Sequence, residues 1–386
     1  MSYDVTAHPP DAGRTRRRGR GLAVGLLIAA GSLLVIVSVL SIWLTTVALD
    51  NATWRSTSQQ MIQNPEIQTE VAEYLVNQLY NSNAVQNDVS GVLPPALQRF
   101  APAVSGGLRQ VAVETSERLL ATPKVQAVWV TANATAHRQL VQLINNQSQF
   151  TKVDNGRVVL DLHPVLIQVA DQIGLGSVAT RLLPANAGEV DIMSSAQLST
   201  VQSIVRILTA ITVIAPLVAV ALFALAVWIA RGFRRRALLW SAIGILLAAI
   251  VLIFIRRELG SQIINALASD PSVRPALVQA WYIGTQVLGT INQTLVIIGV
   301  VLLVGVWLAG AGRIPSAVRG RLAPWITNPI YAFGIPAVVL VILIAWGPLP
   351  IFQKLIPVII IAVLAAIGIE ALRRLTIAER AGAPPS

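Results

Sequence analysis

The 386-residue sequence has no cysteine, very little lysine and few charged residues of any kind. Without cysteine there are no disulfide bonds, no thiolate nucleophile and no cysteine-ligated metal. Only 12% of the residues are charged, about half the share typical of soluble domains. What the sequence does have is apolar residues, at 54% with a mean hydropathy of +0.66. This composition indicates a membrane protein.

Six apolar segments reach or approach the length of about 20 residues that a transmembrane helix needs. They are residues 22–49, 206–230, 237–255, 293–311, 329–347 and 354–372. The first is too long for a signal peptide and lacks a cleavage site, so we expect it to be retained. The segments predict a bundle of six transmembrane helices.

Arginine is concentrated in the alternate connections of this bundle. The basic segments are the tail at 1–21, which we expect to be disordered, the connection at 231–236, the loop at 312–328 and the tail at 373–386. Basic residues mark the cytoplasmic side of a membrane, so both termini are expected in the cytoplasm. The expected partners of these arginines are anionic lipid head groups of the cell membrane rather than a nucleic acid.

Residues 50–205 and 256–292 are then predicted to be extracytoplasmic, as a large domain and a smaller helical lobe. In the large domain, Ile67, Val71, Leu75 and Leu79 recur at helical spacing. A capping residue precedes proline at Asn64-Pro65, Thr122-Pro123 and Asp270-Pro271, which predicts three helix starts.

A strand signal interrupts these helices. Asp154-Asn155-Gly156 predicts a hairpin turn between two strands, and Glu189-Val190-Asp191-Ile192-Met193 predicts a third strand. The expected fold class is a mostly α membrane protein whose extracytoplasmic domain contains a small antiparallel sheet.

Chemistry-bearing residues are sparse. No ionisable residue lies in the middle of a predicted span, where such residues mark ion-coupled transport. His137, His163 and Asp161 suggest a metal site, but their spacing fits no standard pattern. The sequence therefore assigns no catalytic, cofactor-binding or metal-binding residue and implies no cofactor.

Several segments carry a resemblance to a known group of proteins. They are Trp307-Leu308-Ala309-Gly310, Arg319-Gly320-Arg321-Leu322-Ala323-Pro324, Trp346-Gly347-Pro348 and Glu370-Ala371-Leu372-Arg373-Arg374, with Trp129, His137-Arg138 and residues 154–162. In these the chain resembles a family of multi-pass actinobacterial integral membrane proteins of uncharacterised function. The resemblance implies an origin and a topology, and it implies no activity.

Three functions are consistent with the sequence. The leading expectation is a non-enzymatic, scaffold- or receptor-like envelope protein whose extracytoplasmic domain binds a protein, wall or lipid partner. The alternative is a transporter or lipid-handling protein with a path between the spans, and the third is an extracytoplasmic hydrolase with a cleft near His137 or His163. Glycine and alanine recur within the spans, which is compatible with a homo-oligomer.

Overall fold

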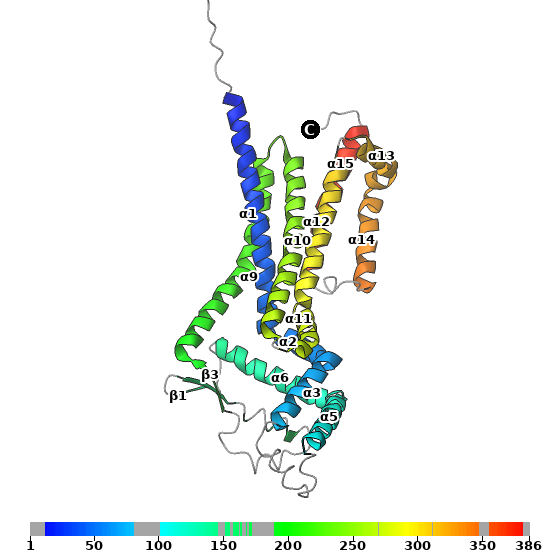
Figure 1. The fold of residues 1–386 in the computed structure, drawn as a ribbon. Coiled ribbons are helices and arrows are strands. Elements are labelled where there is room, and N and C mark those ends of the chain that lie inside the picture. The colour runs from blue at the N-terminus through cyan, green and yellow to red at the C-terminus, as the bar shows by residue number, and fades with distance from the viewer. Residues whose placement is uncertain are drawn as a thin grey trace, which may run out of the picture. The chain divides into compact units, whose positions relative to one another are not determined.

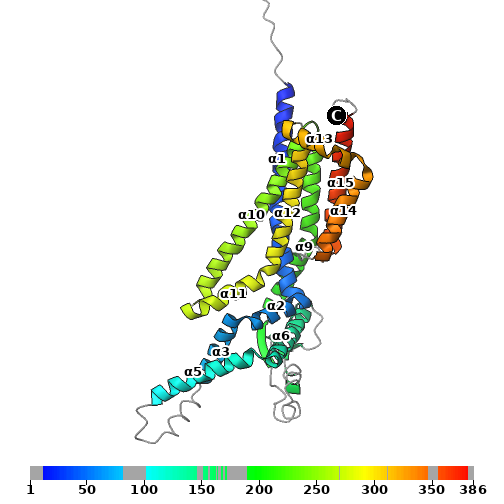
Figure 2. The same cartoon turned by 90° about the vertical axis from the view of Figure 1, so that its right-hand side faces the viewer.

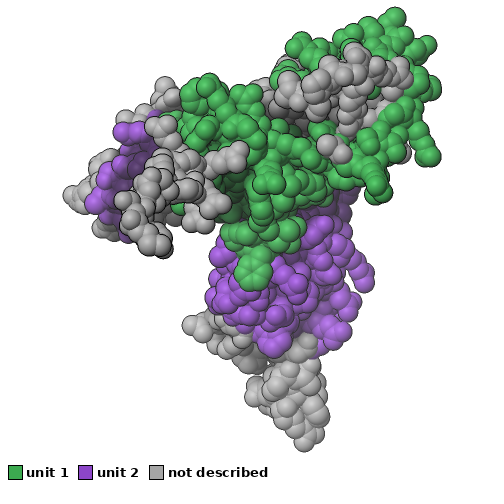
Figure 3. Space-filling view, turned by 90° about the horizontal axis from the view of Figure 1, so that it is seen from above, with its two compact units in different colours: residues 1–41, 211–255, 287–386 green, residues 42–210, 256–286 purple. Residues whose placement is uncertain are grey.

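The chain divides into two compact units, each assembled from separate stretches of sequence. Unit 1 comprises residues 1–41, 211–255 and 287–386, and unit 2 comprises residues 42–210 and 256–286 (Figure 3). The computed structural model describes residues 12–80, 101–145, 151–154, 157–161, 163, 167, 170, 171, 189–268, 270–310, 312–346 and 355–380.

Unit 1 is built around four long apolar helices. They are α1 (Ala12–Leu49), α9 (Ser195–Ile229), α10 (Arg234–Leu267) and α12 (Gln286–Leu308) (Figure 1). Within the described part of the chain, these four are long and apolar enough to cross a membrane. At 1.5 Å per residue, α1, α9 and α10 are about 51 to 57 Å long, whereas the hydrocarbon core is about 30 Å thick. Each of these three helices is therefore longer than the membrane core requires, and each also contributes residues to unit 2.

The prediction of six transmembrane helices is wrong, because the described residues provide four candidates. The fifth and sixth segments fold as α14 (Pro329–Trp346) and α15 (Leu355–Arg380). α14 has 18 residues and contains Pro336, and α15 ends in a charged stretch where Arg373 and Arg374 donate hydrogen bonds to Glu370. Within the described residues, α14 provides a shorter apolar stretch, Pro329–Val338, and is not counted among the four.

Two connecting segments are also more helical than the sequence indicates. Residues 312–328, expected as a basic loop, contain α13 (Arg313–Thr327), which packs against α14 and α15. The N-terminal tail was expected to be disordered to residue 21, but α1 already begins at Ala12.

Small residues allow the helices of unit 1 to pack closely. Val24 and Ile28 of α1 form a buried cluster with Ala226, Ala230 and Ala237 of the α9–α10 corner. At the contact of α1 with α10, a Cβ on Gly244 would overlap the Ser32 hydroxyl, and on α12 a Cβ on Gly299 would lie 2.7 Å from the Leu246 side chain. These close approaches need glycine.

Among the residues that the structure describes, the larger part of unit 2 has four shorter helices. They are α2 (Asn51–Gln63), α3 (Pro65–Tyr80), α5 (Ala101–Leu120) and α6 (Pro123–Ile144). α2 packs against α6, and α3 packs against α5. The buried side chains of Ile62, Ala72, Leu120 and Val130 form the core between them, which is the amphipathic pattern expected of helices with one apolar stripe.

The predicted helix starts are confirmed, with one difference in their chemistry. The amide of Ile67 donates to Asn64 Oδ1 at 3.2 Å, and the amide of Ser272 donates to Asp270 Oδ1 at 2.9 Å. Thr122 precedes α6 without a side-chain cap, because its hydroxyl donates instead to the Leu119 carbonyl at 2.6 Å.

A three-stranded antiparallel sheet of order β1-β2-β3 follows α6 in the chain. Its strands are β1 (Thr151–Asp154), β2 (Arg157–Asp161) and β3 (Glu189–Ser194). Thr151 pairs with Leu160 across β1 and β2, and an irregularity between Val158 and Val159 shifts the register of β2 on β3. These strands lie in the segments for which the sequence predicts strands, and residues 155 and 156 of the turn lie outside the described residues.

The smaller part of unit 2 consists of the end of α10, the short η2 (Pro271–Val273) and α11 (Arg274–Gly284), which leads into α12 (Figure 2). α11 packs against α2 and α3. The Trp43 indole N–H donates to the Gly284 carbonyl at 3.1 Å. The large domain and the smaller lobe that the sequence treats separately are thus one packed unit.

Candidate functional site

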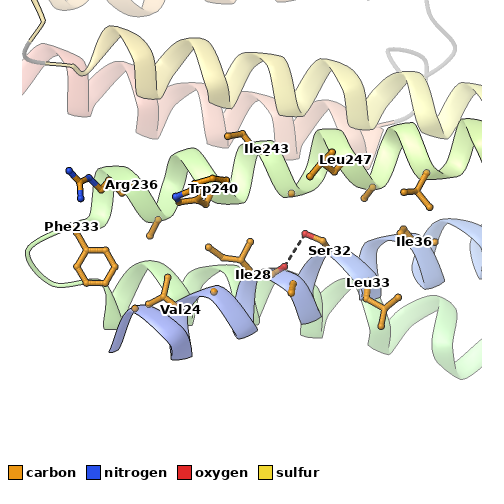
Figure 4. Close-up of a pocket in the computed structure, with 17 residues that line it drawn as sticks. Val24, Ile28, Ser32, Leu33, Ile36, Phe233, Arg236, Trp240, Ile243 and Leu247 are labelled. Carbon is orange, nitrogen blue, oxygen red and sulfur yellow. Dashed lines mark hydrogen bonds between the residues drawn. The ribbon is translucent and has the colours of Figure 1, made fainter. Parts of the chain in front are cut away.

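An apolar groove with a volume of about 630 Å³ lies between α1 and α10 of unit 1 (Figure 4). A cavity of this size lies within the range of about 300 to 1,000 Å³ found for ligand sites. It extends along α1 from Gly21 to Ile36 and along α10 from Phe233 to Val251. We refer to it as the α1–α10 groove.

The groove exists because small and large side chains alternate along the facing sides of α1 and α10. Neither Gly21 nor Gly25 has a neighbour within 4 Å of where a Cβ would stand, so α1 leaves space there. Farther along, α1 and α10 come into close contact at Ser32 and Gly244. The Ser32 hydroxyl donates to the Ile28 carbonyl at 2.9 Å, so the one polar side chain on the α1 wall satisfies its hydrogen bond within its own helix.

One end of the groove carries a positive charge. Arg236 lines it beside Phe233 and Trp240 (Figure 4). Arg236 is exposed, and it makes no hydrogen bond or ion pair with any residue that the structure describes. Its charge is therefore open to a ligand.

Three neighbouring arginines are engaged within the protein. Arg20 donates to the Ile229 carbonyl at 2.9 Å, and Arg235 Nε donates to the Val306 carbonyl at 3.2 Å. The guanidinium of Arg231 lies 5.0 Å from the centre of the Trp228 ring, a cation–π contact. Arg236 differs from these three by being the arginine that faces the groove.

Unit 2 holds the histidine that the sequence considers for catalysis or metal binding. His137 is 5% exposed, its Nδ1 lies 2.9 Å from Asn51 Oδ1, and its Nε2 lies 3.1 Å from the Ala48 carbonyl oxygen. Because a carbonyl can only accept, Nε2 carries the proton of the neutral ring. In the neutral ring Nδ1 is an acceptor. The Asn51 side chain therefore turns its amide nitrogen toward Nδ1, with its oxygen and nitrogen exchanged.

Burial lowers the pKa of His137, against the opposing effects of the Ala48 carbonyl and the Asp50 charge. The ring is therefore held neutral, stacked on Trp54 and bonded at both nitrogens. It joins α6 to the end of α1 and the start of α2 and offers no free nitrogen to a metal or a substrate. The sequence does not reveal this arrangement, because the partners lie 86 and 89 residues away.

The sequence considers, without assigning it, a metal site of His137, His163 and Asp161. Within the described residues no group of three or more His, Asp or Glu side chains is placed to hold a metal. The side chain of Asp161 lies outside the described residues.

Polar residues also concentrate where α10, α11 and α12 meet. Arg256 Nε donates to the buried Thr285 hydroxyl at 2.9 Å, and its guanidinium lies 5.3 Å from the centre of the Tyr282 ring. The Thr285 hydroxyl in turn donates to the Trp281 carbonyl at 2.7 Å. Arg256 is thus a structural residue that fixes the end of α11.

A smaller cavity of about 320 Å³ lies between α2 and α6, lined by Arg55, by glutamines of α2 and by the start of α6. It is more polar than the α1–α10 groove and does not include His137. The cleft near His137 or His163 that a hydrolase would require is therefore not formed by either of these two cavities.

No protein-family model matches the chain, no curated protein is similar to it, and no solved structure matches it. The fold alone therefore defines the class: with four helices of spanning length and composition, this is a membrane protein. The resemblance to actinobacterial integral membrane proteins stays a prediction.

Proposed function

We propose that the chain is a non-enzymatic protein of the cell membrane, with both termini in the cytoplasm and with unit 2 on the outer side as a binding domain. The observation that carries this proposal is which two segments of the chain make up unit 2. Its two stretches, 42–210 and 256–286, are the connections after the first and the third of the four candidate spans. Because successive spans alternate in direction, both connections emerge on the same side of a membrane.

The arginines support the orientation. The basic segments 1–21, 231–236 and 312–328 precede the first span, join the second to the third and follow the fourth. All three then lie on the side opposite unit 2, and the preference of arginine for the cytoplasmic side puts unit 2 outside.

Exposed apolar side chains on two helices of unit 2 support the proposal that this unit binds a partner. Leu108, Val111 and Leu119 on α5 are 48%, 61% and 55% exposed and lie on one face at helical spacing, and Tyr74 and Leu75 on α3 are 60% and 52% exposed. We call these five residues the α3–α5 patch. Apolar side chains grouped on a water-facing surface are typical of interaction sites.

The engagement of His137 supports a non-enzymatic role. Both of its ring nitrogens are used to join helices, as described above. The histidine that would serve a hydrolase as its general base is thus occupied by structural hydrogen bonds.

Photocrosslinking in intact membranes tests whether a partner binds at the α3–α5 patch. A photoreactive residue is placed at Val111 in the α3–α5 patch or, as control, at the neighbouring exposed Gln110 of α5, in the full chain. We expect one defined crosslinked species from position 111, absent from position 110 and lost when Leu108→Glu is added. Identical products from both positions, or no product at 111, would contradict partner binding by the patch.

A second function, lipid handling, is favoured by the α1–α10 groove. An apolar cavity along the surface of two spans suits an acyl chain. Lipid exchange between vesicles that is accelerated by the reconstituted chain would support this second function, and exchange at the protein-free rate would exclude it.

A further inference from the structure

We propose that the α1–α10 groove is a binding site for one anionic phospholipid, with an acyl chain along the apolar walls and the head group at Arg236. This inference rests on the membrane setting of α1 and α10. It does not depend on partner binding by unit 2 or on lipid transport.

The walls of the groove match an acyl chain. Apart from Arg236 and the internally bonded Ser32, its lining consists of glycine and apolar side chains. Several of these are strongly exposed, such as Leu33 at 62% and Leu247 at 55%. On a spanning helix such side chains face hydrocarbon, so the occupant of the groove is a lipid chain rather than water.

The length of the groove also matches that of an acyl chain. From Gly21 to Ile36, α1 rises about 22 Å, against about 15 Å for the hydrocarbon of one leaflet. An acyl chain that starts at the Arg236 end therefore remains in the groove through the full depth of its leaflet.

Charge at the end of the groove selects the head group. Arg236 has no partner among the described residues, whereas Arg20, Arg231 and Arg235 are each engaged by a carbonyl or a ring. A guanidinium binds a phosphate oxygen with strong, charge-assisted hydrogen bonds. A lipid with net negative charge adds attraction that a zwitterionic lipid lacks.

A second copy of the chain is a poorer occupant. Copies inserted in the same orientation would bring both Arg236 side chains to the same depth in the membrane. Like charges at that depth repel each other, whereas a phosphate neutralises Arg236.

Two pairs of variants test the site on the full chain. Arg236→Gln removes the charge that faces the groove, and Arg234→Gln removes an equal charge from the same helical turn outside the lining. Gly25→Leu fills the groove without meeting another atom at Cβ, and Gly305→Leu adds the same side chain on α12 where there is also space. Arg236→Lys keeps the charge.

The purified proteins are equilibrated with phosphatidylglycerol or phosphatidylcholine, and the lipid retained by each is counted by native mass spectrometry. We expect the wild-type chain to retain one phosphatidylglycerol in preference to phosphatidylcholine, and Arg236→Gln to reduce this preference about fivefold. Arg236→Lys and Arg234→Gln retain most of the preference. Gly25→Leu loses the retained lipid of either kind, and Gly305→Leu keeps it.

Three results would overturn the proposal. Equal losses in Arg236→Gln and Arg234→Gln would show general attraction to a basic surface. Unchanged lipid retention in Gly25→Leu would place the lipid elsewhere. A change from dimer to monomer in Gly25→Leu, with lipid retention unaltered, would make the groove a contact between copies of the chain.

Discussion

The indole ring of Trp54 stacks on the imidazole of His137, with ring centres 4.5 Å apart and planes inclined by 9°. Trp54 belongs to α2, the first helix after α1, and His137 lies in the middle of α6. The stacked pair and the bonds of His137 to Asn51 and Ala48 join α6 to α2 and to the end of α1 that belongs to unit 2. This histidine therefore has a structural role, which is open to test.

Replacing His137 should destabilise the protein strongly. His137→Ala removes a stacked ring and two hydrogen bonds from a buried position, at a cost of about 2 to 4 kcal/mol. Arg138→Ala, the next residue along α6, removes an exposed side chain and should cost below about 0.5 kcal/mol. Thermal unfolding of the detergent-solubilised chain measures both, and equal effects would argue against a structural His137.

The same histidine predicts a pH dependence of stability. Because burial lowers its pKa below the ordinary value of 6.5, the unfolded state binds the proton more readily than the folded state. The free energy of unfolding should therefore fall as the pH falls below about 6.5. Melting temperatures between pH 8 and pH 5 measure this loss, which should be smaller in His137→Gln. An unchanged pH profile in that variant would rule out His137 as the source.

Glu70 of α3 should make the opposite contribution. Partial burial, the charge of Glu73 and the charge of Asp270 raise the pKa of Glu70 above 4.5. The folded state then holds the proton more tightly, so Glu70 lowers stability as the pH rises through the region above 4.5.

Glu70→Gln is therefore expected to raise the melting temperature at pH 7 and to leave it nearly unchanged at pH 4. Glu66→Gln is the matched control, because Glu66 lies exposed in the first turn of α3, where its charge favours the helix dipole. Its replacement should lower the melting temperature slightly. A decrease on replacing Glu70 would contradict the assigned repulsion.

The contact between Gly244 and Ser32 predicts a coupling between α10 and α1. A Cβ at position 244 displaces the Ser32 hydroxyl from its hydrogen bond to the Ile28 carbonyl. Gly244→Ala should thus cost about 1 kcal/mol in the wild-type chain and much less in a Ser32→Ala background. A double-mutant cycle on thermal unfolding measures the difference, and additive effects would show that the two residues are not in contact.

Local patterns in the sequence account for several features of this fold. The helix starts at Asn64 and Asp270 follow from a capping side chain before proline. The extension of α9 from Ser195 and of α10 to Leu267 follows from uninterrupted helical patterning. The pairing of Glu370 with Arg373 and Arg374 follows from their spacing on one helix face.

Features that join distant parts of the chain could not be predicted. The environment of His137 depends on Asn51 and Ala48, and the groove depends on α1 facing α10 across more than half of the sequence. The sequence predicts six spans because apolar runs are judged by composition alone, whereas the described residues provide four spanning helices and, in α14, the shorter apolar stretch Pro329–Val338.

Cysteine accessibility in intact cells tests whether unit 2 is one domain outside the membrane. Because the chain has no cysteine, single replacements report cleanly. Ser56→Cys on α2, Ser272→Cys in η2 and Ser316→Cys on α13 are exposed positions in the two parts of unit 2 and in the segment after the fourth span. With a membrane-impermeant maleimide, we expect labelling at 56 and 272 in intact cells and labelling at 316 only after the membrane is opened. Labelling of 56 and 272 from opposite sides, or of 316 in intact cells, would contradict this expectation.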